Sequence, residues 1–113
     1  MGRSFPDRAG GDPADRHAAA VGAIRHVVFQ SPGASQPAVR EAAGRGGELP
    51  EPLAAYAAKV RDQSYRITDA DFAGLTAAGL SDDAIFEITI AAAVGAALQR
   101  LDAGLRAVRK RGA

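Results

Sequence analysis

A single carboxylate stands out among the residues of this chain that could do chemistry, because it interrupts a long apolar run. Glu87 and Thr89 are the only polar residues between Ala84 and Leu98. On a helix, Glu87 shares a face with the apolar residues three, four, seven and eleven positions further on. We therefore expect the carboxylate to point into protein, where it must accept hydrogen bonds or take up a proton.

Two hypotheses for Glu87 stay open at this point. It is either a structural carboxylate bonded to an arginine or a backbone amide, or an acid/base group whose pKa is raised in a cleft. Tyr65, at the end of a predicted helix, has two similar interpretations. It is either a phenol donor lining a pocket near Glu87 or an amphipathic packing residue.

The two histidines offer little toward a metal site. His17 lies on an apolar stripe with Val21, Ile24 and Val28, whereas His26 is about half a turn round the same predicted helix. A metal site made by two histidines of one helix requires a spacing of three or four residues. We interpret both as core or surface histidines and expect no metal and no cofactor. A metal-binding helical protein that uses either one is the weakest functional hypothesis.

The composition argues against several classes of protein. The 113 residues include no cysteine, which excludes thiol catalysis, disulfides and cysteine-ligated metal. The net charge is +1 with acids and bases interspersed, so we expect no nucleic-acid partner. The apolar C-terminal stretch is too short, and carries a carboxylate too near its middle, to span a bilayer convincingly. With no apolar signal segment at the N-terminus, we expect a cytoplasmic protein.

Capping and breaker residues predict an all-α protein with one domain. Residues 1–11 are rich in Gly, Arg and Asp and are predicted to form a flexible arm, and the helical domain covers residues 12–113. No stretch alternates as a strand would. Caps, prolines and glycines predict a small bundle of about five helices with a long core helix at the C-terminus. Their approximate ranges are 12–29, 38–43, 48–65, 68–78 and 81–109.

The core of this bundle is predicted to be thin. Hydrophobic residues make up 47% of the chain but aromatic residues only 5%, and alanine is very frequent. Small residues let helices approach closely but bury little area each, so association would thicken the core. We therefore expect a homo-oligomer. A non-catalytic assembly or accessory subunit, which binds a further copy or another protein, is one of the two leading functional hypotheses.

Several segments in the second half of the chain carry a family pattern. They are L-P-E-P-L-A-A-Y at 49–56, K-V at 59–60, Y-R-I-T-D-A-D at 65–71 and G-L-S-D-D-A-I-F-E at 79–87, continued at 92–96 and 100–105. Over residues 48–108 the chain resembles the carboxymuconolactone decarboxylase / alkylhydroperoxidase-D-like family. The resemblance implies an all-helical fold that oligomerises through its core helices, often as trimers or hexamers.

The redox members of that family use a Glu, a Cys-x-x-Cys pair and a His. Only the Glu is present here, as Glu87, and the other positions fall at about Gln99, Asp102 and Arg106. A thiolate is the nucleophile in that reaction, so we expect neither a peroxidase nor a disulfide reductase.

The decarboxylase branch of the family acts on lactone acids without a thiol. The resemblance therefore implies, as the other leading hypothesis, lyase- or isomerase-type acid/base catalysis on a small organic acid or lactone. Glu87 would be the acid/base, Arg100 or Lys59 would bind the substrate carboxylate, and Tyr65 would line the pocket. Whether the protein is an enzyme stays open at this point.

Overall fold

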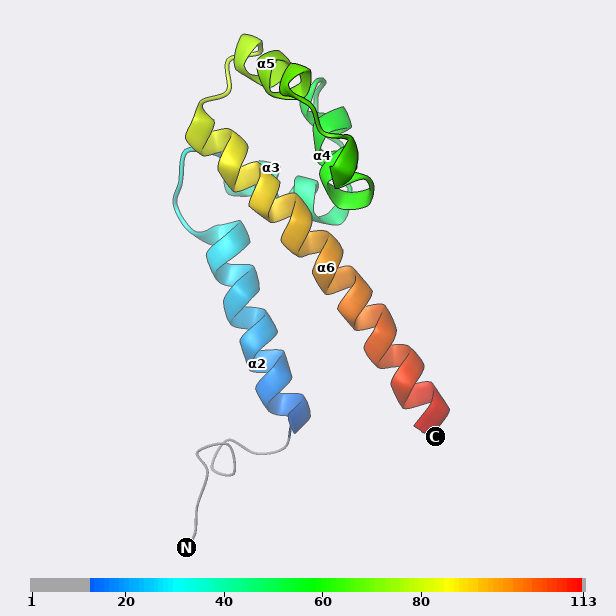
Figure 1. Cartoon of the computed structure of the whole chain (residues 1–113). Helices are drawn as coiled ribbons and strands as arrows, with labels where there is room; N and C mark the ends of the chain where they lie inside the picture. Colours follow the sequence, from blue (N-terminus) through cyan, green and yellow to red (C-terminus); the bar gives the residue numbers. More distant parts are fainter. Residues whose placement is uncertain (1–12, 113) are drawn as a thin grey trace, which may run out of the picture.

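The computed structural model describes residues 13–112, and all regular structure within that range is helical (Figure 1). This confirms the prediction of an all-α protein with five helices, the last of them the longest. The predicted arm at residues 1–11 and the cap at Asp12 lie outside the described residues. In order, the elements are α2 (Pro13–Arg25), a π-helical turn η1 (His26–Gln30), α3 (Pro37–Arg45), α4 (Leu53–Asp62), a 3-10 turn η2 (Ser64–Arg66), α5 (Asp69–Ala77) and α6 (Asp82–Gly112).

Several helix ends lie at the predicted capping residues, whereas the helix predicted over residues 48–65 is shorter and forms only as α4, Leu53–Asp62. The hydroxyl of Ser81 accepts a hydrogen bond of 3.1 Å from the Ala84 amide in the first turn of α6. Thr68 and Asp71 form the predicted capping box, in which the Asp71 carboxylate accepts the Thr68 amide at 2.8 Å. Gly46 and Gly79 have φ of 73° and 98°, the left-handed conformation that favours glycine after a helix.

One glycine of the cluster at residues 44–47 has a different role from the predicted one. Gly44 was expected to end the helix predicted over residues 38–43, but it lies inside α3 and is buried. A Cβ atom on Gly95 of α6 would lie 2.1 Å from the Gly44 carbonyl oxygen. The two glycines therefore allow α3 and α6 to cross at backbone contact, and α3 ends two residues later, at Arg45.

The molecule has two distinct parts, which we call the head and the legs. The head is residues 26–98, and the legs are α2 and residues 99–112 of α6 (Figure 1). Helix α6 has 31 residues, or about 46 Å at 1.5 Å per residue, and it runs through both parts. The last buried residue along α6 is Leu98. The radius of gyration is 17.5 Å, against about 13 Å for a compact domain of 100 residues.

The core lies entirely in the head. Helices α3 and α4 pack along the first half of α6, and Leu75 of α5 completes the cluster. Alanine supplies much of it, as the composition indicated. The buried cluster consists of Ala43, Leu53, Tyr56, Ala57, Leu75, Ile85, Ile88 and Ala92.

Candidate functional site

The Glu87 carboxylate is bound by the loop that precedes α3. One oxygen accepts the backbone amide of Ala34 at 2.8 Å, and the other accepts the amide and hydroxyl of Ser35 at 2.8 and 2.6 Å. A Cβ atom on Gly33 would lie 2.7 Å from both carboxylate oxygens, so only glycine fits there without a shift. We call this group, Gly33, Ala34, Ser35 and Glu87, the latch, because it fastens the loop to α6.

The latch lowers the pKa of Glu87 from 4.5 to about 2. The Ser35 hydroxyl is the largest cause, followed by the Ala34 and Ser35 amides, with attraction from Arg40 and an opposing effect of burial. The shift is opposite to the raised pKa expected of an acid/base group in a cleft. Of the two hypotheses, the structural carboxylate bonded to backbone amides matches the geometry.

A buried arginine holds the same loop from its other side. Arg40 of α3 is only 3% exposed and donates to the carbonyl oxygen of Val28 at 2.9 Å and to that of Ser31. It thereby joins η1, the loop and α3. Sequence reasoning missed Arg40, since its only signal is a cation within a run of small residues, which is usually a solvated side chain.

Lys59 is paired with a helix-capping carboxylate. Its Nζ atom lies 2.9 and 3.0 Å from the two Asp71 oxygens. The Lys59 hydrogen bond is the main cause that lowers the pKa of Asp71, and the Thr68 amide adds to it. Lys59 therefore connects α4 to the first turn of α5.

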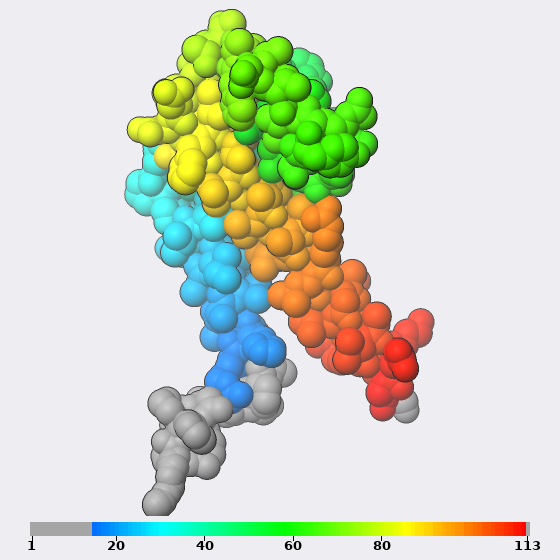
Figure 2. Space-filling model, viewed as in Figure 1, coloured from blue at the N-terminus to red at the C-terminus, as the bar shows by residue number. Residues whose placement is uncertain are grey.

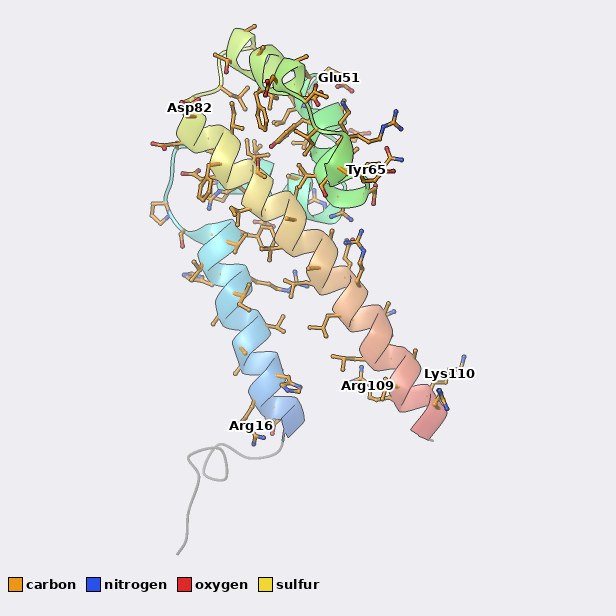
Figure 3. The ribbon with its side chains drawn as sticks, in the orientation of Figure 1. Arg16, Glu51, Tyr65, Asp82, Arg109 and Lys110 are labelled. Atoms are coloured by element: carbon orange, nitrogen blue, oxygen red, sulfur yellow. The ribbon has the colours of Figure 1, made fainter. Side chains whose placement is uncertain are left out.

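Arg100 lies at the start of the α6 leg, and Tyr65 lies at the edge of the head. Arg100 donates to the Arg61 carbonyl oxygen at 2.7 Å, and Arg61 in turn donates to the Gly44 carbonyl and the Gln99 side chain. Tyr65, in η2, is 81% exposed on the outer side of the head (Figure 3).

The structure therefore places the four predicted catalytic residues in separate surroundings. Glu87 is held by residues 34 and 35, Lys59 by Asp71, and Arg100 by the Arg61 backbone, while Tyr65 faces outward. Thr89, the other polar residue of the apolar run, has separate partners: its hydroxyl is 2.5 Å from that of Tyr56 and donates to the Ile85 carbonyl. The catalytic assignment of the four stays a prediction from sequence.

Neither histidine belongs to a metal-binding cluster within residues 13–112, where no three His, Asp or Glu side chains gather. His17 lines a cleft between the legs, and His26 is exposed at the start of η1. On the apolar stripe predicted to contain His17, Ile24 is 44% exposed, while Val21 and Val28 are half-buried.

Helix α6 is long and apolar enough to cross a membrane by length and composition alone. The rest of the fold buries 44%, less than half, of its most apolar stretch. The cytoplasmic location and the absence of a membrane or nucleic-acid partner stay predictions.

No family model matches this chain, and no curated protein or solved structure is significantly similar to it. The resemblance of residues 48–108 to the carboxymuconolactone decarboxylase-like family therefore rests on the motif residues alone. The all-helical fold agrees with that resemblance but is common to many families.

Proposed function

We propose that this protein is a non-catalytic assembly subunit, a small helical protein that works by associating with further copies of itself. The observation that carries the proposal is the exposure of large apolar side chains on both legs and also on the head, where Val27 and Phe86 are exposed. Ile24 in α2 is 44% exposed, and Leu101 and Val108 in α6 are 47% and 68% exposed. Exposed apolar side chains grouped on helices are typical of protein interaction surfaces.

The length of the α6 leg supports the same proposal. None of residues 99–112 is buried, and an isolated helix of this length is only marginally stable in water. Only the N-terminal part of α6 is stabilised by packing against the other helices of the head. Contact with another chain would stabilise the leg and cover its apolar residues.

The state of Glu87 favours assembly over catalysis. With a pKa of about 2 the carboxylate is ionised at neutral pH, and three donors of the loop occupy its oxygens. A general base works best with a pKa near the working pH, and a general acid must carry a proton. Acid/base chemistry on a small organic acid or lactone would require the loop to release Glu87 first, so it is the less favoured hypothesis.

The solution mass of the purified full chain tests this function. We expect sedimentation equilibrium at micromolar concentrations to give a mass at least twice the 11.6 kDa of one chain. A monomer at all concentrations that converts lactone acids, and loses this activity on Glu87→Gln, would contradict the proposal and establish the catalytic hypothesis instead.

A further inference from the structure

One side of helix α6 stays exposed from the head to the end of the leg. Its residues follow one another at intervals of three or four, so they lie along one line of the helix. We call this line the outer face, and it consists of Phe86, Ile90, Ala93, Ala97, Leu101, Gly104 and Val108. All of these residues are exposed, and Figure 2 shows one side of α6 uncovered from its yellow start to its red end.

The outer face points away from the core. Buried residues of α6 such as Ile88 and Gly95 lie about half a turn round the helix, on the side that packs against α3 and α4. No residue of the outer face carries a charge, although Phe86 is 66% and Val108 68% exposed. A second helix can therefore lie on this face without displacing α3 or α4, and it would cover apolar surface along its whole length.

The outer face is almost straight. Phe86, Ala97 and Val108 are eleven residues apart, and a repeat of eleven residues, or about 3.67 per turn, is close to the 3.6 of a straight helix. Two helices packed along this line need only a slight supercoil to stay in contact. The contact could extend over about 33 Å, at 1.5 Å per residue.

The spacing of the outer face is symmetric about Ala97. Counted outward in both directions, the next positions are four, seven and eleven residues away, which pairs Ala93 with Leu101, Ile90 with Gly104, and Phe86 with Val108. A surface with this symmetry matches a second copy of itself about a two-fold axis through Ala97. Two of the three pairs place a large residue opposite a small one, so the side chains can interlock.

The charges along α6 select the same partner and an antiparallel orientation. Residues 82–98 carry three acids and no base, a net charge of −3, whereas residues 99–112 carry five Lys or Arg and one Asp, a net charge of +4. In an antiparallel pair each basic half lies on the acidic half of the other helix, and Asp83 lies opposite Arg111. A parallel pair would place like charges together, and an anionic membrane would repel the acidic half.

We infer that two copies of this chain pack through the outer faces of their α6 helices, antiparallel and crossing at Ala97. The leg of each copy then lies along the head of the other, and Leu101 and Val108 are covered. This inference rests on the proposed assembly function and assigns its surface and its orientation.

The variant Ala97→Glu tests the surface. Ala97 is exposed, so the head should still fold, but the pair would bring two carboxylates together at the two-fold axis. Sedimentation equilibrium of the full chain should show the dimer Kd raised at least about 100-fold. The matched control is Ala103→Glu, the same change at an exposed alanine on another side of α6. Its Kd should stay within about threefold of that of the wild type.

The outcomes separate the surface from the function. An oligomer whose Kd is the same with Ala97→Glu would overturn the outer face as the contact and leave the assembly function standing. A wild-type chain that is monomeric throughout would overturn both. Cooperative unfolding of both variants in urea, followed by circular dichroism, checks that the head is folded.

Single introduced cysteines test the orientation, because the chain has none of its own. In the antiparallel pair two copies of Ala97→Cys meet at the axis and should form a cross-linked dimer under oxidation. Two copies of Gly112→Cys would lie about 45 Å apart along the helices and should stay unlinked. Rapid cross-linking through residue 112, or none through residue 97, would overturn the antiparallel crossing.

Salt gives a second test of the orientation. Since opposite charges face each other in the antiparallel pair, the dimer Kd should rise as NaCl screens their attraction. Tighter association in salt would show that like charges meet, and would overturn the arrangement.

Discussion

The two halves of helix α6 differ both in composition, apolar first and basic after Leu98, and in surroundings. From Ala84 to Leu98 one side of the helix packs against α3 and α4, where two glycines let the backbones touch, while Phe86 and Ile90 on the other side are exposed. From residue 99 onward none of its described residues is buried. The comparison shows that one uninterrupted helix is packed by its own chain at one end and exposed to solvent at the other.

The polar groups of the two parts differ in the same way. In the head, Glu87, Arg40 and Lys59 each bind partners from other elements of the same chain. In the α6 leg, the ion pair between Asp102 and Arg106 is local, one turn apart and exposed. Long-range bonds thus hold the head and reach the first leg residues, where Gln99 and Arg100 bond to Arg61, whereas further along the leg the Asp102–Arg106 pair is local.

The largest expected effect comes from the glycine crossing in the head. Gly95→Ala places a Cβ atom 2.1 Å from the Gly44 carbonyl oxygen, so α3 and α6 must move apart. We expect the free energy of unfolding to fall by about 3 kcal/mol, measured by urea denaturation. The control is Gly74→Ala in α5, where the added Cβ meets nothing within 4 Å. It should stabilise the protein by up to about 1 kcal/mol. Equal effects of the two variants would show that the crossing is not close-packed.

The second largest expected change in the free energy of unfolding comes from the latch. Glu87→Gln replaces one carboxylate oxygen by an NH₂ group that faces backbone donors of the loop, and we expect a loss of about 2 kcal/mol at neutral pH. Ser35→Ala, alone and combined with Glu87→Gln, completes a double-mutant cycle. Because the two side chains share a 2.6 Å hydrogen bond, their effects should be less than additive. Full additivity would mean that the latch does not act as a unit.

The latch also predicts a pH dependence. The pKa of Glu87 is lowered from 4.5 to about 2 in the folded state, so its stabilisation is complete above about pH 4.5. It is lost as the pH falls toward 2. The stability difference between the wild type and Glu87→Gln should therefore shrink in acid, as measured by urea unfolding at pH 7, 4 and 2.5. A difference that grows in acid would indicate the raised pKa of an acid/base group.

A smaller effect is expected at the link between α4 and α5. Lys59→Gln removes the cation that lowers the pKa of Asp71, while the Thr68 amide remains. An NMR titration should show the pKa of Asp71 rising toward its ordinary value of 3.8 without reaching it. Lys110→Gln, in the leg, is the matched control and should leave Asp71 unchanged. A pKa that is the same in all three proteins would show that the Lys59 pair is not formed in solution.

The smallest expected change in the free energy of unfolding comes from a substitution in the α6 leg. Arg106→Gln breaks the exposed pair with Asp102, and we expect a change of about 0.3 kcal/mol in the free energy of unfolding. Urea unfolding in low and high salt should show that even this difference fades with screening. A loss above about 1 kcal/mol would place Arg106 in a long-range contact and weaken the contrast between head and leg.

Much of the local structure could be predicted from residue types alone. Ser81, Thr68, Gly46 and Gly79 mark helix ends because capping depends on neighbouring residues of the chain. The partners of Glu87 could not be predicted in this way. Ala34 and Ser35 are 53 and 52 residues distant, and their backbone amides carry no signal in the sequence.

By itself, then, the sequence determined the helical class, the helix ends and the presence of a carboxylate on an apolar face, since all three follow from short-range spacing. Only the tertiary structure decided that the loop before α3 binds this carboxylate in its ionised form, and that Lys59, Tyr65 and Arg100 lie apart from it. The reason is physical: the pKa and the environment of a side chain depend on distances between atoms from different elements. Those distances are set by how the helices cross, which here depends on Gly44 and Gly95.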